Sequence, residues 1–177
     1  MFSIRHHYYC KLKEQLANIL TLINLSFGIL SLIFLFKGHP SIAVIFIIIA
    51  AMCDRFDGAA ARRFHTESDF GKELDSLSDL ISFGVAPAFL IYQSVLGDTL
   101  WLGIGMVIFY ILAGAIRLAR YNVQTFDGAF YGLPITVAGV FVATSYFIIP
   151  YMPVQFYIIL LLVMGLAMIS SFRIAKM

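Results

Sequence analysis

The chain has 177 residues, of which 61% are hydrophobic and only 12% charged, and its formal net charge is +2. This composition is too apolar for an ordinary water-soluble domain. The small charge, without a basic cluster, gives no sign of nucleic acid as a partner. Cys10 and Cys53 stand far apart, with no CxxC pair or Cys/His cluster. They argue against both a disulfide framework and a zinc site.

The first 15 residues mix basic side chains with aromatic ones. Such a mixture is typical of a segment that lies along the lipid headgroups. A frayed basic terminus that only sets membrane topology is the alternative interpretation. We predict a short N-terminal interfacial segment at 1–15, followed by a single domain over 16–177.

Six apolar stretches follow, separated by glycine, proline or charged residues: 16–36, 41–61, 74–95, 99–119, 133–149 and 154–174. A bilayer core about 30 Å thick needs about 20 apolar helical residues per crossing. The predicted fold class is therefore an all-α integral membrane protein with six transmembrane helices.

An even number of crossings puts both termini on one side of the membrane. The positive charges then all fall on that side except Lys37, and the acidic residues all do so except Asp98. By the positive-inside rule that side is cytoplasmic. We expect both termini and any polar chemistry at the cytoplasmic face of the cytoplasmic membrane.

The second and third helices carry the acidic residues that bear most on function. The second apolar run is too short to cross a bilayer unless its helix continues through 54–62. One face of that helix then holds two carboxylates, two small residues and a guanidinium: Asp54, Asp57, Gly58, Ala61 and Arg62. In the third helix Gly71, Asp75 and Asp79 recur every fourth residue, so they stack on one face.

Four aspartates near membrane depth need strong compensation, because each costs about 2.5 to 3.5 kcal/mol at a helix centre. Clustered oxygen ligands without Cys or His favour Mg²⁺ or Mn²⁺. Four carboxylates are enough for two such ions, which can clamp the attacking and leaving oxygens of a phosphoryl displacement. Two plainer interpretations remain: salt bridges to nearby arginines and Lys72, and helix packing by Gly58, Ala61 and Gly71.

Residues 54–79 match D-x2-D-G-x2-A-R-x8-G-x3-D-x3-D at every fixed position. This pattern resembles the CDP-alcohol phosphotransferase family, and the six-helix plan extends the resemblance over nearly the whole chain. The resemblance implies that four aspartates bind two divalent metal ions, with Asp79 also the catalytic base. It further implies that one set of residues binds the CDP-lipid: Asn18, Thr21, Gly58, Ala61, Arg62, Ser68 and Gly71. Asn18 and Thr21 have an alternative as ordinary interfacial polar residues, and Ser68 as the N-cap of the third helix.

Three further segments, 74–88, 117–123 and 130–134, look like the phosphatidylserine synthase branch of that family. This likeness implies transfer of a phosphatidyl group from CDP-diacylglycerol, or CDP-archaeol, to the hydroxyl of L-serine, with release of CMP. The family resemblance also suggests a homodimer in the membrane.

Arg117 and Arg120 share a helix face. Either arginine can bind the serine carboxylate. An alternative, equally consistent with their positions, is that both side chains snorkel to lipid phosphates. An alternative keeps the chemistry with glycerol 3-phosphate or inositol phosphate as acceptor. A membrane cation transporter is a more distant alternative, but it predicts acidic residues spread across the membrane depth.

Overall fold

The computed structural model describes residues 2–64, 68–123, 130–170 and 173–174. Within these ranges the side chains of 2–14, 16–17, 57–64, 130–131 and 173–174 lie outside the description. The described chain is helical apart from one pair of two-residue strands.

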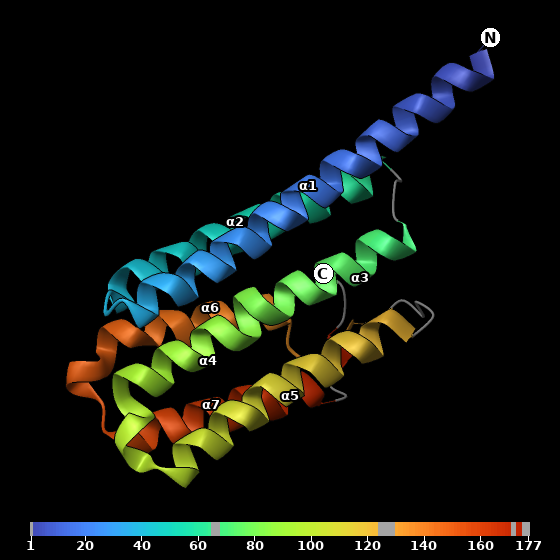
Figure 1. The fold of residues 1–177 in the computed structure, drawn as a ribbon. Coiled ribbons are helices and arrows are strands. Elements are labelled where there is room, and N and C mark those ends of the chain that lie inside the picture. The colour runs from blue at the N-terminus through green and yellow to red at the C-terminus, as the bar shows by residue number, and fades with distance from the viewer. Residues whose placement is uncertain (1, 65–67, 124–129, 171–172, 175–177) are drawn as a thin grey trace.

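The first two helices form an antiparallel pair. α1 (Phe2–Phe36) and α2 (Pro40–Phe64) pack along each other and are joined by a turn at 37–38. Gly38 takes a φ of +80° there, which favours glycine. The predicted start of the first helix at residue 16 is wrong, because the backbone is helical from Phe2. The N-terminal part of α1 projects beyond the other helices (Figure 1).

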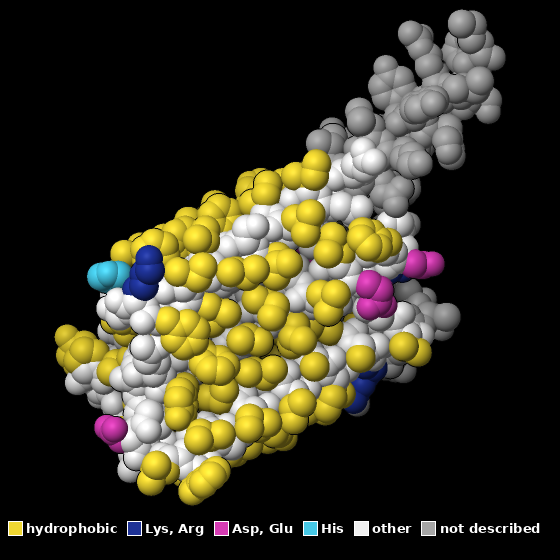
Figure 2. All heavy atoms as spheres, viewed as in Figure 1, with side chains coloured by type: hydrophobic (Ala, Val, Ile, Leu, Met, Phe, Trp, Pro, Cys, Tyr) yellow, Lys and Arg dark blue, Asp and Glu magenta, His cyan; other side chains and the backbone are white. Residues whose placement is uncertain are grey.

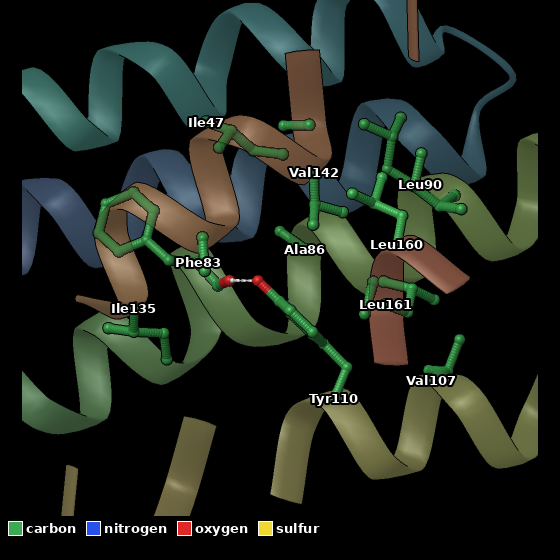
Figure 3. Close-up of a cluster of buried hydrophobic side chains, with 14 of the residues drawn as sticks. Ile47, Phe83, Ala86, Leu90, Val107, Tyr110, Ile135, Val142, Leu160 and Leu161 are labelled. Carbon is green, nitrogen blue, oxygen red and sulfur yellow. Dashed lines mark hydrogen bonds between the residues drawn. The ribbon is translucent and has the colours of Figure 1, made fainter. Parts of the chain in front are cut away.

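The third helical rod is continuous but changes its winding. α3 (Asp69–Asp79) passes into a π-helical segment, η1 (Leu80–Val85), then into α4 (Ala86–Ile91) and a second π-helical segment, η2 (Tyr92–Leu96). A short 3₁₀ turn, η3 (Gly97–Thr99), ends it. Pro87 lacks an N–H and cannot donate to the Phe83 carbonyl four residues earlier. The Tyr110 hydroxyl donates to that carbonyl instead, at 3.2 Å (Figure 3).

Three helices complete the bundle: α5 (Trp101–Val123), α6 (Ile135–Thr144) with its 3₁₀ extension η4 (Ser145–Tyr151), and α7 (Val154–Ile169). The sixth predicted helix is too long, because α7 ends at Ile169. Strand β2 (Arg173–Ile174) then pairs antiparallel with β1 (Phe130–Tyr131). Nearby, the Leu133 amide donates to the Ala167 carbonyl at 3.0 Å. These contacts tie the segment before α6 to the end of α7.

The helices lie roughly side by side in three layers (Figure 1). α1 and α2 form one layer, the α3–η2 rod and α6 form the middle one, and α5 packs on α7 in the third. The core fills the space between them. Its largest side chains include Phe83, Tyr110, Ile135 and Leu161 (Figure 3).

Within the described residues, three helical stretches are long and apolar enough to cross a membrane: Asn18–Phe36, Asp69–Thr99 and Trp101–Val123. Ile135–Tyr151 and Val154–Ile169 are shorter apolar helices. In the view of Figure 2, hydrophobic side chains cover the flank of the bundle and charged ones lie near its two ends. An exposed apolar flank of this extent is suited to lipid rather than water.

Candidate metal and catalytic centre

Three of the four predicted aspartates come together between α2 and α3. Asp54, Asp75 and Asp79 each offer a carboxylate oxygen, and these oxygens lie within 4.8 Å of one another. Asp79 is only 8% exposed, whereas the other two are half-buried. The cluster therefore sits at the edge of the bundle interior, with one member well inside it.

The helical periods explain this meeting. Asp75 and Asp79 lie one turn apart on α3, and the predicted stack with Gly71 is confirmed. Asp54 lies on α2, whose helix continues to Phe64 as the length argument required. Asp57 belongs to the same helix, but its side chain lies outside the described residues, so its part in the cluster stays a prediction.

Two polar side chains from other helices hold the cluster. Thr136 on α6 donates from Oγ1 to Asp54 Oδ2 at 3.2 Å, and Asn24 on α1 donates from Nδ2 to Asp79 Oδ1 at 3.4 Å. Sequence reasoning missed both residues. A signal for Asn24 was present, since it follows Asn18 and Thr21 at three-residue spacing in a mostly apolar stretch of the chain. Thr136 offered no comparable signal.

The electrostatics of the cluster favour cations. Two like charges about 4 Å apart repel by roughly 4 kcal/mol at an effective dielectric of about 20, and here three carboxylates share that space. The donor set is entirely oxygen, which fits Mg²⁺ or Mn²⁺ rather than softer metals. Asp54, Asp75 and Asp79 are thus suited to hold a divalent ion.

The predicted CDP-lipid residues gather beside this cluster where they are described. Ser68 caps α3, because its Oγ accepts from the Gly71 amide at 3.1 Å, so the N-cap interpretation is confirmed. A β-carbon at Gly71 would lie 3.2 Å from both Ser68 Oγ and Asn18 Oδ1, so the three residues meet. Thr21 is buried one turn along α1 from Asn18. The side chains of Gly58, Ala61 and Arg62 fall outside the described residues.

The two predicted acceptor arginines differ in their surroundings. Arg117 is half-buried, its guanidinium interacts electrostatically with Asp79, and its Nε is buried without a hydrogen-bond partner in the described structure. Arg120 donates from a terminal guanidinium nitrogen to the Ile169 carbonyl at 2.9 Å. It therefore caps the last turn of α7.

A separate cavity lies at the opposite end of the bundle. It is lined by Leu35, Gly38, Pro40, Ser41, Gln93, Ser94, Tyr146, Phe147, Ile149 and Pro150. None of these residues carries a formal charge, so the cavity offers no counterpart to the carboxylate cluster. The arrangement suited to cation and phosphate chemistry is the aspartate end.

A helical bundle with an apolar flank and clustered carboxylates on two adjoining helices defines a membrane protein with a candidate site for a hard cation. The sequence model of the CDP-alcohol phosphatidyltransferase family matches residues 14–171. The chain belongs to this family of transferases, and with its apolar helices it is an integral membrane protein.

Curated relatives are similar over much of the chain. An archaetidylserine synthase of Methanothermobacter thermautotrophicus is 41% identical over 74% of this chain and 57% of its own length. A CDP-diacylglycerol–serine O-phosphatidyltransferase of Bacillus subtilis is 39% identical over 68% of each chain. One of that name from Methanocaldococcus jannaschii is 36% identical over 99% of this chain and 78% of its own. This chain thus spans little more than half of the length of the archaetidylserine synthase.

Proposed function

We propose that this protein transfers a phosphatidyl group from CDP-diacylglycerol, or its archaeol counterpart, to the hydroxyl of L-serine. The observation that carries the proposal is the meeting of Asp54, Asp75 and Asp79 within 4.8 Å, at the positions of the family motif. The printed names of the three relatives, each a serine transferase or an archaetidylserine synthase, support serine as the acceptor.

Asp54, Asp57, Asp75 and Asp79 would hold two divalent ions, Mg²⁺ or Mn²⁺. When bound, such ions draw charge from the pyrophosphate and stabilise the departing phosphate. Asp79 takes the proton of the acceptor hydroxyl. The freed oxygen forms a bond to the phosphorus that bears the lipid alcohol, the bond from that phosphorus to the bridging oxygen breaks, and CMP leaves with the electron pair.

The nucleotide end of the lipid substrate is assigned to the surface beside the cluster. Asn18, Ser68 and Gly71 meet at the start of α3, where their polar groups can hydrogen-bond to a headgroup. Thr21, Gly58, Ala61 and Arg62 complete the proposed CDP-lipid site, with Arg62 on the phosphates. The backbone of α2 carries the last three of these along the same helix as Asp54.

Of the two arginines, Arg117 is the better candidate for the serine carboxylate. Its positive charge interacts electrostatically with Asp79, whereas the Arg120 guanidinium donates to the Ile169 carbonyl at the end of α7. A guanidinium matches one carboxylate well. A dianionic acceptor such as glycerol 3-phosphate or inositol phosphate would need more compensation at a partly buried site. The transporter alternative loses support, because the clustered carboxylates gather at one place in the bundle.

In the membrane, we propose that all six helical rods cross the bilayer, with both termini and the aspartate cluster on the cytoplasmic side. The charge distribution of the sequence supports this orientation. Residues 2–15 belong to the part of α1 that projects beyond the other helices, and in this proposal the segment 1–15 meets the headgroups there, while the protein acts as a homodimer. Cysteine labelling of single-cysteine variants at Lys37 and Asp98, with a reagent that cannot cross the membrane, tests the orientation from outside the cell.

The reaction is tested by CMP release from the purified full-length chain. The assay contains CDP-diacylglycerol, Mg²⁺ or Mn²⁺, and one of L-serine, glycerol 3-phosphate or inositol phosphate; parallel reactions contain CDP-archaeol or a chelator. We expect metal-dependent CMP release and a new lipid with serine only. Robust turnover with glycerol 3-phosphate and none with serine would overturn the proposed acceptor. Turnover that survives complete chelation would overturn the metal site.

A further inference from the structure

Two residues that interact with Asp79 each carry a buried polar atom without a hydrogen-bond partner. Among the described residues, the buried side-chain nitrogen and oxygen atoms without a partner are Asn24 Oδ1, Ser31 Oγ and Arg117 Nε. Asn24 also donates to Asp79, and Arg117 interacts electrostatically with the same carboxylate. Native proteins leave few buried polar atoms unsatisfied, because each one costs free energy. Two such atoms on residues that act on one carboxylate therefore point to a ligand that supplies the missing partners.

The chemistry of Asp79 fixes which way the Asn24 amide points. An ionised carboxylate only accepts hydrogen bonds, so the amide NH₂ must face Asp79 and the carbonyl oxygen must face away from it. The side chain of Asn24 is 0% exposed, so bulk solvent does not reach that oxygen. Asn24 Oδ1 is thus an acceptor held beside the proposed base.

Neighbouring contacts keep Asn24 in this position. The Ser82 hydroxyl on η1 donates to the Asn24 backbone carbonyl at 3.2 Å, and the Ser78 hydroxyl on α3 donates to the Thr21 carbonyl at 3.1 Å. One turn further on, Gly28 brings the α1 backbone against Ser82, whose Cα would lie 2.9 Å from a β-carbon at that glycine. The helix that bears Asn24 cannot slide past Asp79 without breaking these contacts.

Asn24 Oδ1 is an unpaired acceptor and Arg117 Nε an unpaired donor, and together they match the ammonium and the carboxylate of an amino acid. We propose that Asn24 Oδ1 accepts a hydrogen bond from the α-ammonium of the acceptor, while Arg117 binds its carboxylate and Asp79 takes the proton of its hydroxyl. This inference rests on the proposed serine transfer and makes Asn24 a specificity-determining residue. Glycerol 3-phosphate and inositol phosphate lack an ammonium and would leave Asn24 Oδ1 unpaired.

A comparison of two acceptors separates recognition of the ammonium from positioning of Asp79. 3-Hydroxypropionate is serine without its amino group, so it keeps the hydroxyl and the carboxylate. We expect the wild-type protein to use L-serine about 10- to 100-fold better than 3-hydroxypropionate in kcat/KM, the usual range for a hydrogen bond to a charged group. Asn24→Leu and the smaller Asn24→Ala should lose this preference, because the remaining activity no longer depends on the ammonium.

Ser31→Ala is the matched control, because Ser31 also lies on α1, two turns beyond Asn24, and also has a buried unpartnered atom. It should keep both the activity and the preference for serine. If Asn24 only positions Asp79, its variants will lose kcat/KM equally for both acceptors, and that outcome overturns the inference.

The wild-type protein alone also tests the inference, should both Asn24 variants fail to fold. Equal use of serine and 3-hydroxypropionate overturns the role of Asn24 while leaving serine transfer intact. A wild-type protein that releases CMP with other alcohols and not with serine overturns the proposed function itself. Comparing CMP release with L-serine and with 3-hydroxypropionate therefore distinguishes failure of the Asn24 inference from failure of the proposed function.

Discussion

Two buried contacts between helices in this protein are built in different ways. Where α1 meets α3 and η1, two serine hydroxyls donate to backbone carbonyls of α1 and Gly28 brings the backbones together. We call this contact the polar seam. Where α5 meets α7, apolar side chains such as Val107 and Leu161 (Figure 3) and Gly165 against the Phe109 ring make most of the contact, and the Arg120 hydrogen bond to Ile169 lies at its end. We call this the apolar seam.

The difference shows how one bundle can hold its site residues in fixed positions and still tolerate changes in packing elsewhere. Lipid is as apolar as leucine, so close approach at small residues and hydrogen bonds set how membrane helices meet. In the polar seam these bonds fix α1 along the direction of α3, and Asn24 and Asp79 lie within the same contact. The apolar seam has side chains, such as the half-buried Phe109 ring, that can shift without moving the aspartate cluster. We therefore expect damage to the polar seam to reduce catalysis, and damage to the apolar seam to reduce stability alone.

The largest effect should come from Asp79 itself. Asp79→Asn removes the proposed base but keeps the size of the side chain and a group able to contact Asn24. We expect kcat to fall by about 10²- to 10⁴-fold, the usual contribution of a positioned acid or base, while the protein stays folded and binds CDP-lipid. CMP release and a CDP-lipid binding assay measure the two properties. Substantial turnover in this variant would remove Asp79 from the mechanism.

Asp54→Asn and Asp75→Asn should lose comparable activity for a different reason. Each removes one anionic oxygen ligand from the cluster, so metal affinity should fall by at least about 10-fold, together with turnover. Titration of Mn²⁺ followed by its paramagnetic resonance signal gives the affinity independently of activity. Asp98→Asn, at the other end of the bundle in η3, is the matched control and should change neither property. An unchanged titration in both cluster variants would mean that the metal site is wrongly placed.

Gly28→Ala should break the polar seam. The new β-carbon would overlap the Ser82 hydroxyl and lie 2.9 Å from Ser82 Cα, so the helix backbones must separate. A displacement of about 1 Å near reacting groups can cost about 100-fold in rate, and overpacking costs about 1 to 3 kcal/mol of stability. We expect CMP release to show the lower rate and a thermal melt in detergent to show the lower stability. Ser82→Ala combined with Gly28→Ala should recover only part of the activity, because the contact with Ser82 Cα remains.

Thr136→Val should have a smaller effect on the same centre. Valine keeps the shape of threonine but removes the hydroxyl that donates to Asp54 at 3.2 Å. Loss of a partner that orients a metal ligand typically costs about 10- to 100-fold in metal affinity. We expect the lower end of this range, because Asp54 keeps other interactions. Thr136→Ser should retain the wild-type affinity in the same Mn²⁺ titration, and a loss in both variants would argue for packing instead.

Much of this fold could be predicted from sequence, because its signals are periodic. All six apolar stretches fall largely in helices, and the spacing of Gly71, Asp75 and Asp79 places them in one stack. Helix ends were less predictable. The apolar pattern runs on past Ile169, but the chain leaves the helix there and residues 173–174 pair with β1 instead. Tyr131 pairs with Arg173, 42 positions later, and Phe130 with Ile174, 44 positions later, and no local pattern contains partners so far apart.

The candidate site was predictable only where its residues share a helix. The spacing of the aspartates predicts which of them face the same way, but it does not predict that Asn24 and Thr136 reach them from α1 and α6. Those contacts depend on how the helices pack. The two arginines illustrate the same limit. Arg117 and Arg120 look equivalent in the sequence, yet only the structure assigns Arg120 to the end of α7.

The smallest effect on activity should come from the apolar seam. A β-carbon at Gly165 would lie 2.5 Å from Cε1 of Phe109, which is the edge of a ring rather than backbone. Phe109 is only half-buried, so the ring has room to turn aside. Gly165→Ala should therefore lower stability by about 1 to 2 kcal/mol, as moderate overpacking does.

The value of this variant lies in its pairing with Gly28→Ala. Both insert one methyl group at a tight contact between two helices, so they differ mainly in whether that contact holds site residues. The Gly165 variant should keep kcat within about twofold of wild type below its melting temperature, since no group near Asp79 needs to move. Phe109→Leu in the Gly165→Ala background should restore stability by making room for the methyl group. If Gly165→Ala reduces kcat as much as Gly28→Ala at equal folded fraction, the two seams are not functionally distinct.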